Sequence, residues 1–232
     1  SLGVGNYDVC YVTISGDSVI NAQVYGGNRY SSSVAGTSAV SKSANLTISG
    51  GTFNNYIFGG GMAWAINKSS TGDVISQVTQ GTKIAISSAT VNHEVYGGGY
   101  AAANANSTVT VECGRSIVNG GSSITVTDSN IVNLYGGGYN ASAGSVVNGG
   151  ASITIKGNSQ IGNVYGGGNA TGTADIRANS IVNDGVNITI DCSTAGSNIT
   201  LANVYGGGNS GTVVNGGSTI TFKGDVTGDS SL

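Results

Sequence analysis

The feature that most constrains this chain is a short phrase that occurs six times: an apolar residue, an aromatic residue and then two or three glycines. Successive copies are 30 to 40 residues apart. A period of about 20 to 50 residues is typical of solenoids, propellers and other repeat arrays. The chain is therefore built from repeated units. Their aromatic residues are Tyr25, Phe58, Tyr96, Tyr135, Tyr165 and Tyr205.

Two further phrases recur in each unit. An apolar-Thr-apolar triplet, such as Ile124-Thr125-Val126, occurs in seven copies, of which one has Ala85 in place of Thr. In the later units a β-branched pair is followed by an Asn-Gly corner, as in Val146-Val147-Asn148-Gly149-Gly150. Each unit thus offers three short strands separated by Gly or Asn corners. Alternation within the Thr strand predicts that its apolar residues point inward and its Thr points outward.

These units predict an all-β fold. No segment shows a helical stripe, whereas short strands at regular spacing with Gly and Asn punctuation are typical of β proteins. The simplest arrangement of three strands per unit is a three-sided coil, in which each strand pairs with its copy one coil away. We therefore expect a parallel β-helix (β-solenoid) of six or seven coils, about 30 Å long at about 4.8 Å per coil. A propeller, the main alternative, needs four antiparallel strands per blade.

The composition excludes several classes of protein. Eight Lys and Arg against eleven Asp and Glu argue against a nucleic-acid partner. No apolar run reaches the about 18 residues of a membrane-spanning helix, so no membrane insertion is expected. The 41 glycines occur without proline and without Gly-X-Y order, which excludes collagen. A hydrophobic fraction of 38% and a net charge of −3 argue against a disordered chain.

Stacked coils would place equivalent residues in columns. We expect the six aromatic residues to form one column of stacked rings, in which Phe58 shows that the hydroxyl is dispensable. The glycine triplets are expected to form tight corners that need positive φ and no Cβ. Asn amides can bond to their copies in the next coil. Two such Asn columns are expected, one of Asn133, Asn163 and Asn203 and one of Asn119, Asn148, Asn183 and Asn215.

Candidate ligand-binding residues lie where the unit length varies. The variation falls mostly between the glycine triplet and the next strand, and insertions in solenoids usually map to one face, often the binding face. That face would carry Trp64, Tyr100 and Tyr139. Stacking on sugar rings would give these aromatic residues a binding role, and packing against the coil is the structural alternative. The partner they suggest is a polysaccharide or a host or plant glycan.

The sequence offers no catalytic constellation. His93 is the single histidine, and we expect it and Glu94 to face opposite ways in a strand, so they form no Ser-His-Asp set and no three-His zinc site. The carboxylates are scattered. Asp128 and Asp191 are expected two coils and about 10 Å apart, where they could flank the water of an inverting glycosidase. We therefore predict no catalytic residue, no metal and no cofactor, and keep an enzyme as the alternative.

The three cysteines, Cys10, Cys113 and Cys192, are an odd number, so at least one thiol stays unpaired. None lies in a CxxC motif, and we expect them to be small buried residues. The outward Thr column resembles an ice-binding face. However, Ala85 interrupts this column, and Lys156 interrupts the outward column two residues further along the strand. That hypothesis is therefore disfavoured against Thr as an ordinary outward strand residue.

The VYGGG and ITI phrases, which span nearly the whole chain, resemble the repeat regions of surface and adhesin-like proteins of gut and rumen anaerobic bacteria. This resemblance implies a secreted, repetitive parallel β-helix located outside the cell or on its surface. The segment from Asp225 to Ser230 resembles the start of a dockerin-type calcium loop, with Thr227 where Asn or Asp is usual. We therefore divide the chain into one solenoid domain, 1–224, and a tail, 225–232, that would begin a following module.

Together these observations lead to one expectation and two alternatives. We expect a module for cell-surface attachment or carbohydrate interaction without catalysis. The first alternative is a β-helix polysaccharide lyase or glycoside hydrolase, and the second is a structural spacer. The sequence carries no signal for an oligomeric state.

Overall fold

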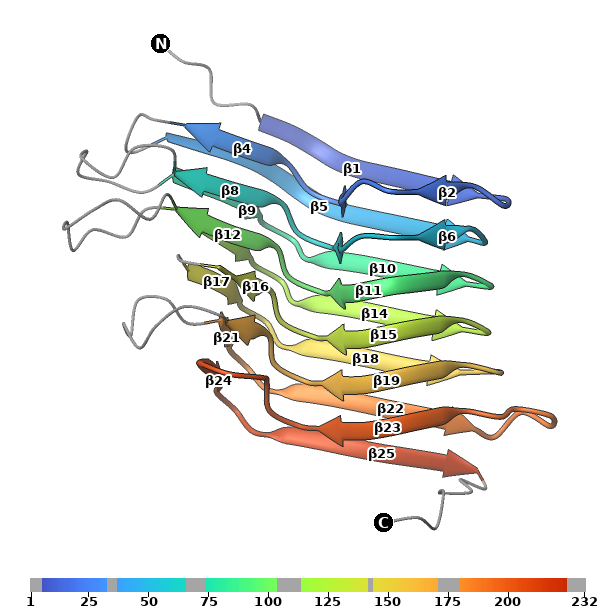
Figure 1. Cartoon of the computed structure of the whole chain (residues 1–232). Coiled ribbons are helices and arrows are strands. Elements are labelled where there is room, and N and C mark those ends of the chain that lie inside the picture. The colour runs from blue at the N-terminus through green and yellow to red at the C-terminus, as the bar shows by residue number, and fades with distance from the viewer. Residues whose placement is uncertain are drawn as a thin grey trace.

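The protein is a parallel β-helix (Figure 1). The computed structural model describes residues 6–32, 37–65, 74–103, 114–141, 144–170 and 180–224, and all regular structure in these ranges is β-strand. The coils stack in chain order from β1 (Asn6–Ser15) at one end to β25 (Ser218–Gly224) at the other. Within the described ranges, no helix is long and apolar enough to cross a membrane.

The largest sheet, sheet A, has 12 strands in two stacks that meet in β5 (Thr37–Ser49). One stack continues through β9 (Val74–Val78), β13 (Arg115–Val118), β17 (Gly144–Val147), β21 (Ser180–Val182) and β24 (Thr212–Val214). The other contains β1, β10 (Thr82–Ser87), β14 (Ser122–Thr127), β18 (Ala151–Lys156), β22 (Val186–Cys192) and β25.

The other two sheets complete each coil. Sheet B has eight strands and sheet C has five. The strands of sheet B are β2 (Val19–Ile20), β3 (Val24–Tyr25), β6 (Thr52–Phe53), β7 (Ile57–Phe58), β11 (Thr90–Tyr96), β15 (Asn130–Tyr135), β19 (Gln160–Tyr165) and β23 (Thr200–Tyr205). Those of sheet C are β4 (Arg29–Ser32), β8 (Met62–Ala65), β12 (Tyr100–Ala103), β16 (Tyr139–Asn140) and β20 (Asn169–Ala170).

The three sheets do not correspond one to one with the three sequence phrases. The Thr phrase and the β-branched phrase both lie in sheet A, on either side of the Asn-Gly corner. Sheet C is formed by the residues directly after the glycine triplets, which we did not predict as strands. These segments are only two to four residues long, too short for alternation to reveal them.

The core lies inside the coil and is formed by columns of apolar residues. Ile124 pairs in register with Ile153, which pairs with Ile188, and each is about 1% exposed. Thr125 lies between two buried residues and is itself half-exposed, which confirms the inward and outward faces expected for this strand. Burial of such columns is the main stabilising contribution in a repeat that cannot cover its own apolar face.

The glycine triplets differ from expectation. None of their residues has positive φ, so they are not left-handed corners. Instead, a Cβ on Gly99 would collide with the Ser116 hydroxyl and the Gly61 carbonyl oxygen of neighbouring strands. Glycine is needed here because the backbones of successive coils and a buried Ser approach closely. The left-handed corners lie instead after the Asn residues, at pairs such as Gly120-Gly121 and Gly149-Gly150, with φ of 80° to 91°.

Candidate functional site

The aromatic residues of the six units stack along the outside of sheet B. Successive ring centroids are 4.7 to 5.1 Å apart, and the ring planes differ by only 5° to 13°. The middle of this ladder is covered, since Phe58, Tyr96 and Tyr135 are at most 2% exposed. They form a cluster separate from the interior core. The ladder is therefore a second apolar layer, which needs a cover on its outer side.

That cover is a set of aromatic side chains at the junction of sheets B and C. Tyr100 and Tyr139 pair in register, and their rings stack with centroids 5.5 Å apart. Tyr56 stacks on Tyr139 at 6.1 Å and also contacts the ladder ring of Phe58. Tyr100 and Tyr139 remain half-buried. Part of each ring thus packs against the ladder, and part faces solvent.

Trp64 extends this surface along sheet C. It alternates with Ala63, which is fully buried, and so shares the outer face with Met62. Met62 pairs in register with Tyr100, which places Trp64 on the same face, one coil away. The Trp64 side chain is 37% exposed. The structure therefore brings the three candidate residues Trp64, Tyr100 and Tyr139 to one surface, which we call the aromatic surface.

The column of Tyr100 and Tyr139 changes chemistry in the last coils. Asn169 and then Asn209 occupy the positions that follow Tyr139. The Asn169 amide donates a hydrogen bond to the Tyr96 hydroxyl, 3.3 Å away. Beside these amides Tyr165 is half-buried, and Tyr205, the last ring of the ladder, is 45% exposed. Apolar rings and amide groups thus lie side by side on the aromatic surface.

Burial raises the pKa of the ladder tyrosines. The pKa of Tyr135 rises to about 12, first because burial disfavours the phenolate and then through the neighbouring Tyr165. Burial likewise raises the pKa of Tyr25 and of Tyr96 well above the usual value. The pKa of Tyr100 is raised by burial and by Tyr139. These phenols are neutral at physiological pH and can donate hydrogen bonds.

Asn side chains form ladders at the predicted positions. Asn203 donates to Asn163 at 2.9 Å, and Asn163 donates to Asn133 at 2.8 Å. The second ladder connects Asn215, Asn183, Asn148 and Asn119 through bonds of 2.7 to 2.8 Å. A third ladder was missed: it joins Asn92, Asn54 and Asn21 at 2.7 and 2.8 Å. The signal was present, because each lies four residues before its aromatic residue.

The expectation that His93 and Glu94 face opposite ways was wrong. The register of β11 against β15 shifts between Val91 and Glu94, and this irregularity brings both side chains together. His93 Nδ1 lies 3.1 Å from Glu94 Oε2, and the His93 ring lies 4.5 Å from the Tyr56 ring. Glu94 also accepts a bond from the Asn133 amide at 3.4 Å. His93 thus packs against Tyr56, next to the aromatic surface.

The two candidate carboxylates, Asp128 and Asp191, accept hydrogen bonds from turn residues. Asp128 has a φ of 50° and accepts a hydrogen bond from the Asn158 N–H at 2.7 Å. Asp191 accepts bonds from the hydroxyl and the N–H of Ser193, which lower its pKa, and Lys223 and Lys156 lower it further. A general acid needs a raised pKa, and that of Asp191 moves the other way. In the part of the chain that the structure describes, no group of three or more His, Cys, Asp and Glu side chains could hold a metal ion.

Cys10 and Cys192 are free thiols and half-buried rather than buried as expected. Cys10 lies in the first strand, β1, and Cys192 is the last residue of β22. Cys113 and the tail 225–232 lie outside the described residues.

We compared the chain with protein-family models, with curated proteins and with solved structures, and none of them matched it.

Proposed function

We propose that this protein is a non-catalytic carbohydrate-interaction module of an extracellular or cell-surface protein, and that it holds its glycan on the aromatic surface. The observation that carries the proposal is the stacked pair Tyr100 and Tyr139 with the exposed Trp64 on the same face. Aromatic side chains combine an apolar body with a polar tip, which suits a sugar ring with C–H faces and hydroxyl edges.

The surroundings of these rings support the same ligand class. The amides of Asn169 and Asn209 continue the column of Tyr100 and Tyr139 and can both donate to and accept from sugar hydroxyls. Only 8% of the residues are charged, which favours a neutral glycan over a polyanion. The resemblance to surface and adhesin-like repeat proteins supports the extracellular location.

The test is a pull-down with insoluble cellulose, xylan and mannan, together with a glycan array, with release of reducing sugar measured in the same wells. We expect binding without release. Trp64→Ala and Tyr139→Ala should each weaken binding about tenfold, which corresponds to about 1.4 kcal/mol. Phe222→Ala is the control, because Phe222 is an exposed aromatic residue on β25 at the far end of the solenoid.

Three other outcomes of this test would contradict the proposal. Release of reducing sugar would support the lyase or hydrolase alternative and direct attention to the carboxylates. Absence of any binding would leave the spacer alternative. Binding that Phe222→Ala weakens as much as Trp64→Ala would show that the aromatic surface is not the site.

A further inference from the structure

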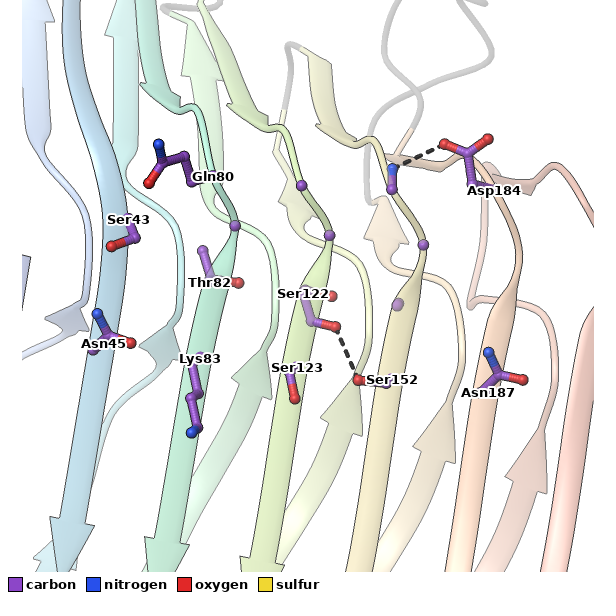
Figure 2. A pocket seen from close by; sticks show the side chains of 16 residues that line it. Ser43, Asn45, Gln80, Thr82, Lys83, Ser122, Ser123, Ser152, Asp184 and Asn187 are labelled. Carbon is purple, nitrogen blue, oxygen red and sulfur yellow. Dashed lines mark hydrogen bonds between the residues drawn. The ribbon is translucent and has the colours of Figure 1, made fainter. Parts of the chain in front are cut away.

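A polar groove crosses five coils of sheet A, well away from the aromatic surface. It has a volume of about 310 Å³ and follows the corner between the two strand stacks of that sheet. Its floor consists of the bare glycine corners Gly120-Gly121 and Gly149-Gly150. Figure 2 shows that Gln80 and Asp184 stand at opposite ends of this floor. Hydroxyl and amide side chains form one flank: Asn45, Ser123, Ser152 and Asn187, with Lys83 among them.

The groove exists because one column of side chains is interrupted. Four successive units have Gln80, Gly120, Gly149 and Asp184 at the same position, two residues before the next strand begins. The two middle residues have φ of 80° and 91°, which glycine adopts without strain. The fold therefore keeps the middle of the column empty, while an amide and a carboxylate close its ends.

The Asp184 side chain reveals what this empty position can bind. Its Oδ2 accepts a hydrogen bond from the N–H of Gly149 in the preceding coil at 2.9 Å (Figure 2). One coil earlier, Gly149 stands at the position of Asp184 and has no side chain that could accept from the N–H of Gly120. A hydroxyl oxygen of a ligand in the groove would occupy the place that the Asp184 carboxylate takes one coil further on.

The remaining polar groups restrict the ligand class. The Asp184 carboxylate can accept hydrogen bonds from sugar hydroxyl groups, and the amides of Gln80 and Asn187 can both donate and accept them. Ser123 and Ser152, whose hydroxyls also line the groove, are half-exposed. One cation, Lys83, balances one anion, Asp184, among the lining residues. The volume lies at the lower end of small-ligand sites, which span about 300 to 1,000 Å³. A neutral, hydroxyl-rich group the size of one or two sugar rings fits these features.

We propose that this groove is a second carbohydrate subsite, which takes a neutral sugar residue through the Gly120 N–H, the Gln80 amide and the Asp184 carboxylate. The inference rests on the proposed function for the class of ligand, but on different residues. A glycan held at both places would contact two faces of the solenoid, and simultaneous contact raises the overall affinity without any new bond at either site.

The test is a titration of the uniformly ¹⁵N-labelled protein with cellopentaose, xylopentaose and mannopentaose, followed by amide chemical shifts. We expect saturable shifts at the N–H groups of Gly120 and Gly149 and at the Gln80 side chain with at least one of the three sugars. Asp184→Asn, which keeps an acceptor for the Gly149 N–H, should weaken this binding about tenfold. Trigalacturonic acid should bind more weakly than the neutral sugars.

A pair of variants on β18 separates the groove from the rest of the face. Ser152→Tyr places a ring in the groove at an outward strand position that accepts large side chains, and should abolish the shifts. Thr154→Tyr makes the same change two residues along the same outward face, outside the groove lining, and should preserve them. Shifts that survive Ser152→Tyr, absence of shifts at the groove with all three sugars, or tighter binding of trigalacturonic acid would overturn the inference.

The same titration distinguishes this inference from the proposed function. Shifts at Trp64 and Tyr139 without shifts at Gly120 would support the aromatic surface and overturn the groove. Shifts at Gly120 alone would support the groove and contradict the aromatic surface. Shifts at neither place would overturn both.

Discussion

The Ser145 hydroxyl donates a hydrogen bond of 3.1 Å to the carbonyl oxygen of Gly99, which lies 46 residues earlier. Ser145 is fully buried, and its hydroxyl reaches this oxygen only because Gly138 beside it has no Cβ. The same relationship recurs in other coils. Ser76 donates to the carbonyl of Asn28, Ser116 to that of Gly61 and Ser180 to that of Gly138. In these four coils the buried Ser and the last glycine of the triplet therefore form one structural device.

Replacing the donor of this bond tests its contribution. Ser145→Ala should lower the free energy of unfolding by about 1 kcal/mol, because one buried hydrogen bond is lost while Gly99 O keeps its bond from the Tyr139 N–H. Urea denaturation measures the change. Ser123→Ala, on the half-exposed outer face, is the control and should change stability by less than about 0.5 kcal/mol. Equal effects for the two variants would contradict the role of the buried bond.

The middle glycines of the triplets offer a matched pair. A Cβ on Gly137 would lie 2.7 Å from the backbone N of Gly168, whereas nothing lies within 4 Å of a Cβ on Gly207 in the last coil. Gly137→Ala should therefore lower the free energy of unfolding by about 3 kcal/mol through overpacking. Gly207→Ala should be close to neutral. Thermal unfolding followed by circular dichroism compares them, and similar losses would show that backbone conformation, not close approach, selects glycine here.

The Asn ladder can be tested from its middle and its end. Asn148 both donates to Asn119 and accepts from Asn183, so Asn148→Ala removes two partly buried hydrogen bonds. We expect a loss of about 2 kcal/mol in the free energy of unfolding. Asn215→Ala removes one exposed bond at the end of the ladder and should cost less than half as much. An end variant as damaging as the middle one would argue against the ladder as a source of stability.

The aromatic ladder makes the fold sensitive to alkaline pH. The pKa of Tyr135 is raised to about 12 in the folded state, above the ordinary value of 10.0. The folded protein thus holds this proton more tightly, and the stability this provides is present below pH 10 and is lost as the pH rises from about 10 to about 12. Circular dichroism between pH 8 and pH 12 should show unfolding on that rise, together with late appearance of tyrosinate absorbance.

Tyr135→Phe provides the control for the pH effect. Phe58 already occupies the same column, so the ring alone supports the stack, and the variant should fold normally at pH 7. It should unfold at a higher pH than the unaltered protein, because one buried ionisable group is removed. An unchanged alkaline midpoint would show that Tyr135 does not contribute to the transition.

Some features of the structure could be recognised from the sequence because they repeat at a fixed position. The Thr column, the aromatic ladder and two Asn ladders follow from stacking identical units. A buried Ser also recurs three residues before Asn119, Asn148 and Asn183, and this regularity could have been found. The short strands of sheet C could not, because two to four residues carry no usable periodicity.

Other features depended on contacts between units. The contact of His93 with Glu94 arises from a register shift in β11, which local alternation does not reveal. The polar groove exists because Gly120 and Gly149 leave the middle of one column without side chains, while Gln80 and Asp184 close the two ends of that column.

The repeat period, the outward Thr and the glycine, asparagine and aromatic positions determined by themselves that this chain forms a parallel β-helix, because each unit must bury its apolar face against the next. The tertiary structure alone decided why glycine is required in each triplet, how Trp64, Tyr100 and Tyr139 come to share a surface, and where the groove lies. The physical reason is that these properties depend on the approach of backbones and side chains from different coils, 30 to 46 residues apart along the chain.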